Sequence, residues 1–162
     1  MTRLLLSALL LTILSARGFA EELSASTADM TAAAGKYPLA VCPISGEKLG
    51  EMGDPVTNVY GGREVTFCCK NCVGTFEKDL AASMKALDKQ IIETLSVTYP
   101  TDVCLGCGDP ISAMGKPYAH LYKNQLIMLC CKECVASFEG NTAVALGALE
   151  EARRMAKEPA HE

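Results

Sequence analysis

The cysteines of this chain form two sets that are related by a constant offset of 62 residues. The chain has 162 residues and nine cysteines, and eight of the nine pair across this offset. The ninth, Cys107, stands where the first set has Ser45. An internal repeat constrains the architecture before any local pattern does, so we expect one unit to occur twice. The paired cysteines are Cys42 and Cys104, Cys68 and Cys130, Cys69 and Cys131, and Cys72 and Cys134.

Residues other than cysteine repeat at the same offset, without a gap. Tyr37-Pro38 recurs as Tyr99-Pro100, and Gly46 recurs as Gly108. The agreement predicts a duplicated unit. The first copy with its linker helix is expected over residues 37–96, and the second copy with a C-terminal helix over residues 99–157.

The order of patterns inside each copy predicts an α+β fold. A cysteine-bearing turn comes first, and two short strands joined by a two-residue turn follow it. A helix is then expected to start near Lys70 in copy one and near Lys132 in copy two. The predicted strands are Val56–Tyr60 and Arg63–Cys68 around Gly61-Gly62, then Tyr118–Tyr122 and Gln125–Cys130 around Lys123-Asn124.

The helical pattern differs between the copies. In copy one, apolar residues recur at steps of three and four, which predicts one continuous helix with a single apolar face. In copy two the pattern is weaker, and Gly140 and Asn141 are candidates for an interruption. The residues of the copy-one face are Phe76, Leu80, Met84, Leu87, Ile91 and Leu95.

The first twenty residues have the pattern of an export signal. Arg3 precedes an apolar run from Leu4 to Leu14, and small residues flank Phe19 before Glu21. The run is too short to cross a bilayer core of about 30 Å as a helix. We therefore expect a signal peptide over residues 1–20 and a flexible leader over 21–36. The mature protein is expected in the periplasm or outside the cell, without a stable membrane anchor.

Composition argues against several functions. The net charge is −4, and the chain has no tryptophan and no basic block, so nucleic acid is not an expected partner. No acid–base pair stands in a recognisable motif and no cofactor loop occurs, so an enzyme is not expected. Because nine is an odd number, a complete set of disulfides would leave one thiol unpaired.

The cysteine spacing is typical of a metal site. Tetrahedral zinc is commonly held by four Cys or His ligands, often as two Cys-x-x-Cys pairs. Copy two has these pairs as Cys104 with Cys107 and Cys131 with Cys134, with Cys130 either spare or in place of Cys131. Copy one has Cys42 and the Cys68, Cys69 and Cys72 group, with Ser45 in the fourth place. It could offer three thiolates to a soft ion, recruit Cys69 as well, or leave an exchangeable position open. The candidate ligands are Cys42, Cys68, Cys69, Cys72, Cys104, Cys107, Cys130, Cys131 and Cys134, and the candidate ions are zinc and copper(I).

Both copies resemble the TRASH/YHS family of treble-clef heavy-metal-binding domains. The resemblance rests on Cys42-Pro-x-Ser-Gly, on the hairpin, and on Phe67-Cys68-Cys69-x-x-Cys72 followed by Phe76; in copy two it rests on Cys104, Leu129-Cys130-Cys131-x-x-Cys134 and Phe138. It implies two tandem treble-clef-like units that sense, transport or detoxify a metal, often copper. The family's recurring thiols would correspond to Cys42, Cys68 and Cys72, then Cys104, Cys130 and Cys134. The Cys-x-x-Cys turn of copy two and the export signal depart from the family pattern and leave the metal open.

Three interpretations of the cysteines remain. The first is an exported protein that binds, buffers or delivers a heavy-metal ion, with a second protein that donates or accepts the ion as a possible partner. The second is an interaction module without metal, stapled by disulfides, which exported proteins readily form. The third is a thiol redox protein, although the strand and helix pattern of a thioredoxin is missing around either Cys-x-x-Cys.

Overall fold

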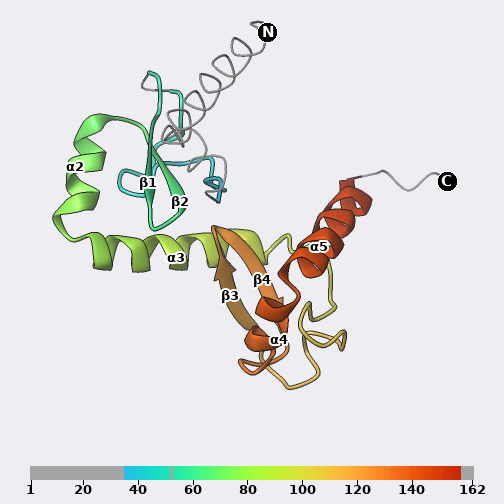
Figure 1. The fold of residues 1–162 in the computed structure, drawn as a ribbon. Helices are drawn as coiled ribbons and strands as arrows, with labels where there is room; N and C mark the ends of the chain where they lie inside the picture. Colours follow the sequence, from blue (N-terminus) through green and yellow to red (C-terminus); the bar gives the residue numbers. More distant parts are fainter. Residues whose placement is uncertain (1–34, 52, 158–162) are drawn as a thin grey trace, which may run out of the picture. The chain divides into compact units, whose positions relative to one another are not determined.

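The computed structural model describes residues 35–51 and 53–157, which lie within one compact unit of residues 34–162. The predicted signal peptide, the leader as far as residue 34 and the tail from residue 158 lie outside the described residues. Within them the fold is α+β, with two two-stranded antiparallel sheets and four helices. Figure 1 shows the same element order twice along the chain, a hairpin followed by two helices.

Both predicted hairpins are present. β1 (Val56–Tyr60) pairs with β2 (Arg63–Phe67), and β3 (Tyr118–Tyr122) pairs with β4 (Gln125–Leu129). The turn residues have positive φ angles, as two-residue hairpin turns of this kind require. These are 56° and 75° at Gly61 and Gly62, and 47° and 69° at Lys123 and Asn124. Each second strand ends at the residue immediately before the Cys-Cys pair, one residue earlier than predicted.

The prediction of one continuous helix in copy one is wrong. The chain forms α2 (Lys70–Lys78) and α3 (Leu80–Ser96), with a break at Asp79. Asp79 has φ −141° and ψ 80°, and its carboxylate accepts a hydrogen bond of 3.0 Å from the backbone N–H of Ala82. This cap starts a new helix. Leu80 is 41% exposed, so it does not belong to the buried face.

The interruption predicted for copy two is confirmed. α4 (Cys134–Gly140) ends just before Asn141, and α5 (Thr142–Lys157) begins just after it. Asp79 and Asn141 are separated by the repeat offset of 62 residues, so the two breaks are equivalent. α4 begins two residues later than expected, because residues 132 and 133 form a turn.

Each copy has its own small apolar core. In copy one, the Phe67 and Phe76 rings meet edge to face at 5.2 Å between centroids. In copy two, the fully buried Phe138 ring packs against Tyr122 at 5.6 Å. The helix after each break contributes further buried residues. Besides the cysteines, the other buried apolar members are Leu39, Val65, Leu87 and Ile91 in copy one, and Ile127, Leu129, Ala145 and Leu149 in copy two.

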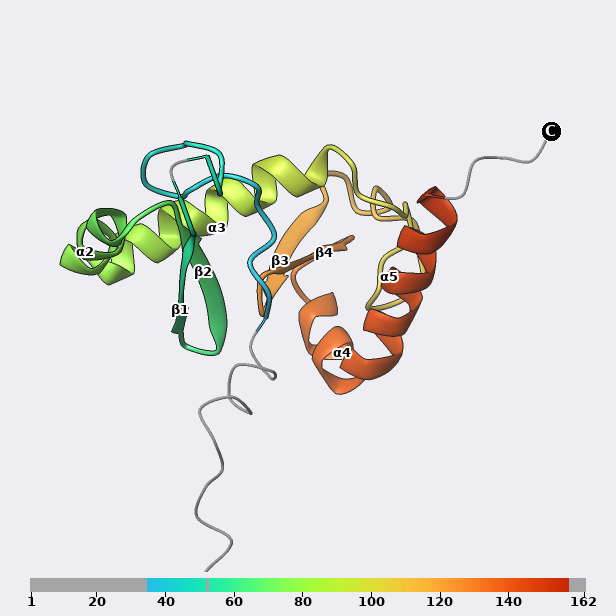
Figure 2. The ribbon, with the colours of Figure 1, turned by 90° about the horizontal axis from the view of Figure 1, so that it is seen from above.

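The two copies also contact each other. Helix α3 belongs to copy one and packs against β3 and β4 of copy two, and Figure 2 shows it passing both hairpins. Leu121 of β3 packs against the copy-one core. The two copies therefore pack against each other rather than folding as separate units. Among residues 35–51 and 53–157, no helix has the length and apolar character needed to cross a membrane.

Candidate metal centres

Three buried thiols of copy one form the group that we call cluster one. The sulfur atoms of Cys42, Cys68 and Cys72 all lie within 4.8 Å of one another. Cys42 begins a tight turn in which the backbone N–H of Gly46 donates to the Cys42 carbonyl at 2.9 Å. Cys68 follows β2 directly, and Cys72 lies in the first turn of α2. Their exposed fractions are 1%, 5% and 9%.

Four thiols of copy two form cluster two. The sulfur atoms of Cys104, Cys107, Cys130 and Cys134 lie within 4.8 Å of one another. The turn repeats that of copy one, since the N–H of Gly108 donates to the Cys104 carbonyl at 2.9 Å. Cys130 follows β4, and Cys134 is the first residue of α4. Cys107 is exposed.

The sulfur separations suit one ion in each cluster. With a zinc–sulfur bond of about 2.3 Å, two ligands of a tetrahedral ion lie about 3.8 Å apart. Cys68 and Cys72 are 3.6 Å apart, and Cys130 is 3.6 Å from Cys107 and 3.5 Å from Cys134. All nine cysteines are free thiols in this structure. Each cluster can therefore hold a metal ion with little rearrangement.

The fourth position differs between the clusters. Ser45 Oγ lies 3.4 Å from Cys68 Sγ, which corresponds to the 3.6 Å between Cys107 Sγ and Cys130 Sγ. Ser45 and Cys107 occupy the same place in the repeat, and both are exposed. Cluster one thus offers three thiols and a weakly coordinating hydroxyl, whereas cluster two offers four thiols.

The two remaining cysteines lie beside the clusters. Cys69 Sγ is 3.9 Å from Cys68 Sγ and 3.8 Å from Cys72 Sγ, but it does not belong to cluster one. Cys131 stands in the same relation to cluster two. Of the two arrangements left open for copy two, the structure groups Cys130, rather than Cys131, with the other three thiols.

The first cysteine of each cluster favours the thiolate. Burial alone would raise the pKa of Cys42, but backbone N–H groups of Ser45, Cys68 and Ile44 and the Ser45 hydroxyl stabilise the anion and lower its pKa to about 6. Cys104 is also buried, yet hydrogen bonds from the copy-two turn and from Cys130 lower its pKa to about 7. Metal binding needs thiolates, so each cluster has one ligand ready near neutral pH.

The helix-side cysteines favour the protonated thiol. Burial, together with the neighbouring sulfurs of Cys68 and Cys69, raises the pKa of Cys72 to about 12. The sulfurs of Cys130 and Cys131, with burial, raise the pKa of Cys134 far above its ordinary range. Several thiolates within 4 Å would repel one another, so these protons leave only when a cation replaces them.

Gly106 makes a close backbone contact beside cluster two that the sequence patterns did not single out. A Cβ atom there would lie 2.6 Å from the Cys134 carbonyl oxygen and 2.7 Å from its Cβ. Ser137 Oγ also donates to the Gly106 carbonyl at 2.6 Å. The copy-two turn is therefore pressed against the start of α4. The sequence feature that could have indicated this close approach is the glycine itself, because the equivalent residue of copy one is Ile44.

Histidine and the repeated methionine are also metal-binding residue types, but neither His120 nor Met114 belongs to the clusters. His120 is partly buried and stacks edge to face on Phe138 at 5.8 Å, and it belongs to neither cluster. Met114 is 73% exposed, and its counterpart Met52 lies outside the described residues.

The fold and the clusters define a cysteine-rich α+β protein with two places for a metal ion, one in each copy of a duplicated unit. In comparisons with protein-family models, curated proteins and solved structures, nothing matches this chain.

Proposed function

We propose that the protein binds a soft heavy-metal ion, zinc or copper(I), through cysteine thiolates, and that it buffers the ion or delivers it to another protein. One observation carries the proposal: in both copies, buried thiols from a turn, a strand end and a helix start converge within 4.8 Å. Thiolates select zinc and copper(I) over hard cations such as magnesium or calcium. Catalysis is not part of this proposal.

The resemblance to TRASH/YHS domains supports the same function. The thiols that correspond to the family's recurring ligands are Cys42, Cys68 and Cys72, and these form cluster one. Their copy-two equivalents all belong to cluster two. We further propose that each copy is a treble-clef-like unit and that the protein acts after export, in the periplasm or outside the cell.

The small cores support a structural contribution from the metal. Among residues 35–51 and 53–157, each copy has a two-stranded sheet and two helices around its buried residues. Structural zinc contributes on the order of 10 kcal/mol in small peptides. Since the clustered cysteines are part of each core, a bound ion would tie the turn, the strand end and the helix together.

The difference at the fourth position supports a division of roles. Cluster two, with four thiols, has the ligand set of a closed tetrahedral zinc site. Cluster one, with Ser45 in place of the fourth thiol, would leave one coordination position for an incoming ligand. We propose that cluster two retains its ion and that cluster one exchanges it with a donor or acceptor protein.

A disulfide-stapled interaction module is the second candidate. The observation in its favour is the short separation of Cys107 and Cys130, 3.6 Å, in a protein expected to be exported. A disulfide would require the sulfurs to approach to about 2.0 Å. This candidate predicts folding that chelators do not disturb.

Mass spectrometry of the protein purified anaerobically from its native compartment tests the proposal. Native spectra would show the bound ions, and denatured spectra after alkylation would count the free thiols. We expect one or two soft ions and mostly alkylatable cysteines. Cys72→Ser and Cys134→Ser should each lose about one ion. A metal-free protein with eight cysteines in disulfides would favour the second candidate instead.

A further inference from the structure

The cysteines outside the clusters form a second, shallower arrangement of thiols. In copy one, Cys69 Sγ completes a triangle with Cys68 and Cys72 whose edges are 3.9, 3.8 and 3.6 Å. We call this the outer triangle of copy one. It shares the Cys68–Cys72 edge with cluster one and replaces Cys42 by Cys69.

Copy two has the same arrangement. The sulfurs of Cys130, Cys131 and Cys134 form an outer triangle with edges of 3.9, 3.5 and 3.5 Å. It shares the Cys130–Cys134 edge with cluster two. Because the geometry occurs in both copies, a chance side-chain position in one of them does not explain it.

The outer triangles have dimensions that suit an ion. Three sulfurs about 3.8 Å apart are each about 2.2 Å from their common centre, close to a metal–thiolate bond length. Cys69 and Cys131 are partly exposed, whereas the two thiols that each shares with its cluster are at most 9% exposed. The outer triangle therefore lies between solvent and the buried ligands.

We propose that Cys69 and Cys131 are entry ligands, a role that rests on the proposed metal binding. An arriving zinc or copper(I) ion first binds to Cys69 with Cys68 and Cys72, and the protons that these thiols still carry pass to water. It keeps the bonds to Cys68 and Cys72 while the bond to Cys69 breaks and a bond to Cys42 forms. No electron is transferred, and any proton that Cys42 releases is balanced by the proton that Cys69 takes up from water. The reverse sequence releases the ion.

Copy two follows the same sequence with its equivalent residues. The bond to Cys131 breaks and bonds to Cys104 and Cys107 form while Cys130 and Cys134 remain bound, so the ion gains a fourth ligand. Any protons carried by Cys104 and Cys107 pass to water, and Cys131 takes one proton up from water. Holding the entering ligand beside the ion makes exchange an intramolecular step, which accelerates it relative to direct attack from solution. The adjacent cysteines thus affect the rate of metal movement rather than the final affinity.

The test compares the full-length mature protein with the double variant Cys69→Ser/Cys131→Ser. Both are loaded anaerobically with zinc at one equivalent per cluster. Transfer to a chromophoric chelator is followed by stopped flow, and affinity is measured by equilibrium competition with the same chelator. We expect an unchanged affinity and transfer that is slower by about tenfold or more, because the intramolecular path is lost. Each single variant should slow only one of two kinetic phases.

Asn71→Ser is the matched control, since Asn71 is exposed and lies between Cys69 and Cys72. It should change neither rate nor affinity. Unchanged transfer in the double variant would overturn the entry role, while metal binding would stand. A large loss of affinity would also overturn it, by making the two cysteines permanent ligands. Stable uptake of two ions per copy would replace it by a thiolate-bridged pair. If the wild-type protein took up no ion, the proposed function itself would fail.

Discussion

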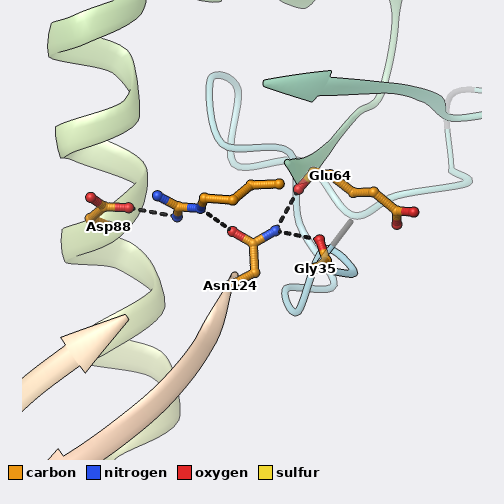
Figure 3. Close-up of polar contacts among 5 residues, drawn as sticks. Gly35, Glu64, Asp88 and Asn124 are labelled. Carbon is orange, nitrogen blue, oxygen red and sulfur yellow. Dashed lines mark hydrogen bonds and ion pairs between the residues drawn. The ribbon is translucent and has the colours of Figure 1, made fainter. Parts of the chain in front are cut away.

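Arg63 Nε donates a hydrogen bond of 2.7 Å to Oδ1 of Asn124, and this contact joins the start of β2 to the hairpin turn of copy two. The same guanidinium forms an ion pair with Asp88 of α3 at 2.6 Å. The amide nitrogen of Asn124 donates to the carbonyls of Gly35 and Glu64 at 2.9 and 2.7 Å. Figure 3 shows these contacts. Asn124 occupies the place that Gly62 has in copy one, so the turn of copy two has a side chain that binds the first copy where the turn of copy one has none.

Removing the Asn124 amide should destabilise the contact between the copies. Asn124 is 1% exposed, and no other polar residue is buried in the part of the chain that the structure describes. Asn124→Gly suits the φ of 69° but leaves Arg63 and two carbonyls without these partners. Unpaired buried groups cost about 1–3 kcal/mol, so the free energy of unfolding in urea should fall by about that amount.

Metal stoichiometry is the control for this variant. The clusters do not include Asn124, so both should bind their ions as in the wild type. Asn124→Asp should fall between the two proteins in stability, since it keeps an acceptor for Arg63 and loses the amide donors. A glycine variant as stable as the wild type would contradict the importance of the contact.

Local turn and strand patterns predicted both hairpins, because they act over a few positions. The apolar spacing of copy one did not predict the break at Asp79, although the interruption expected at Asn141 lies at the repeat offset from it. Leu80 fits the three- and four-residue spacing of an apolar face, yet a side-chain cap overrides the continuation of the helix. The sequence also did not predict the role of Asn124. The Lys123-Asn124 pattern indicates a turn whether or not the Asn124 amide contacts a distant hairpin.

Seven of the nine candidate cysteines gather in the two clusters, and the spacing did not decide between the neighbours in each Cys-Cys pair. Cys68 and Cys72 are four residues apart, and the chain between them turns from an extended Cys69, with φ −161° and ψ 166°, into α2. That change of direction brings Cys68 and Cys72 to one side and places Cys69 next to both. It depends on backbone angles at the junction, which no residue spacing specifies.

Gly106→Ala should weaken cluster two alone. The added Cβ would meet the backbone of Cys134, so the turn or the start of α4 must shift and the four thiols would no longer converge as well. Changes to groups that orient metal ligands typically cost about 10–100-fold in affinity, and we expect a loss in that range. Competition with a chelator would measure it. Ile44→Ala is the matched control at the equivalent, exposed position of copy one and should leave both affinities unchanged.

Exchanging the residues at the fourth position should exchange the properties of the clusters. Ser45→Cys gives cluster one a fourth thiol beside Cys68, and its affinity for zinc should rise while cluster two is unaffected. Cys107→Ser should lower the affinity of cluster two toward that of cluster one. Chelator competition on each variant measures both sites. An unchanged affinity of cluster one in Ser45→Cys would contradict the proposed division of roles.

The stability of the metal-free, reduced protein should rise between pH 6 and pH 9. The pKa of Cys42 falls from an ordinary value of about 9 to about 6 on folding, and that of Cys104 falls to about 7. A group whose pKa is lowered in the folded state contributes stability above its unfolded pKa, and that contribution is lost as the pH falls through the folded value. Above pH 9 the raised pKa of Cys72, about 12, has the opposite effect, so stability should decline again.

Urea denaturation at a series of pH values, with a metal-free reductant present, measures this profile. The double variant Cys42→Ser/Cys104→Ser removes both thiolates, and its stability should vary much less between pH 6 and pH 9. Zinc should suppress the variation in the wild type, because the bound ion keeps the thiols deprotonated until acid displaces it. A variant profile parallel to that of the wild type would show that the hydrogen bonds around these two sulfurs do not stabilise the thiolates.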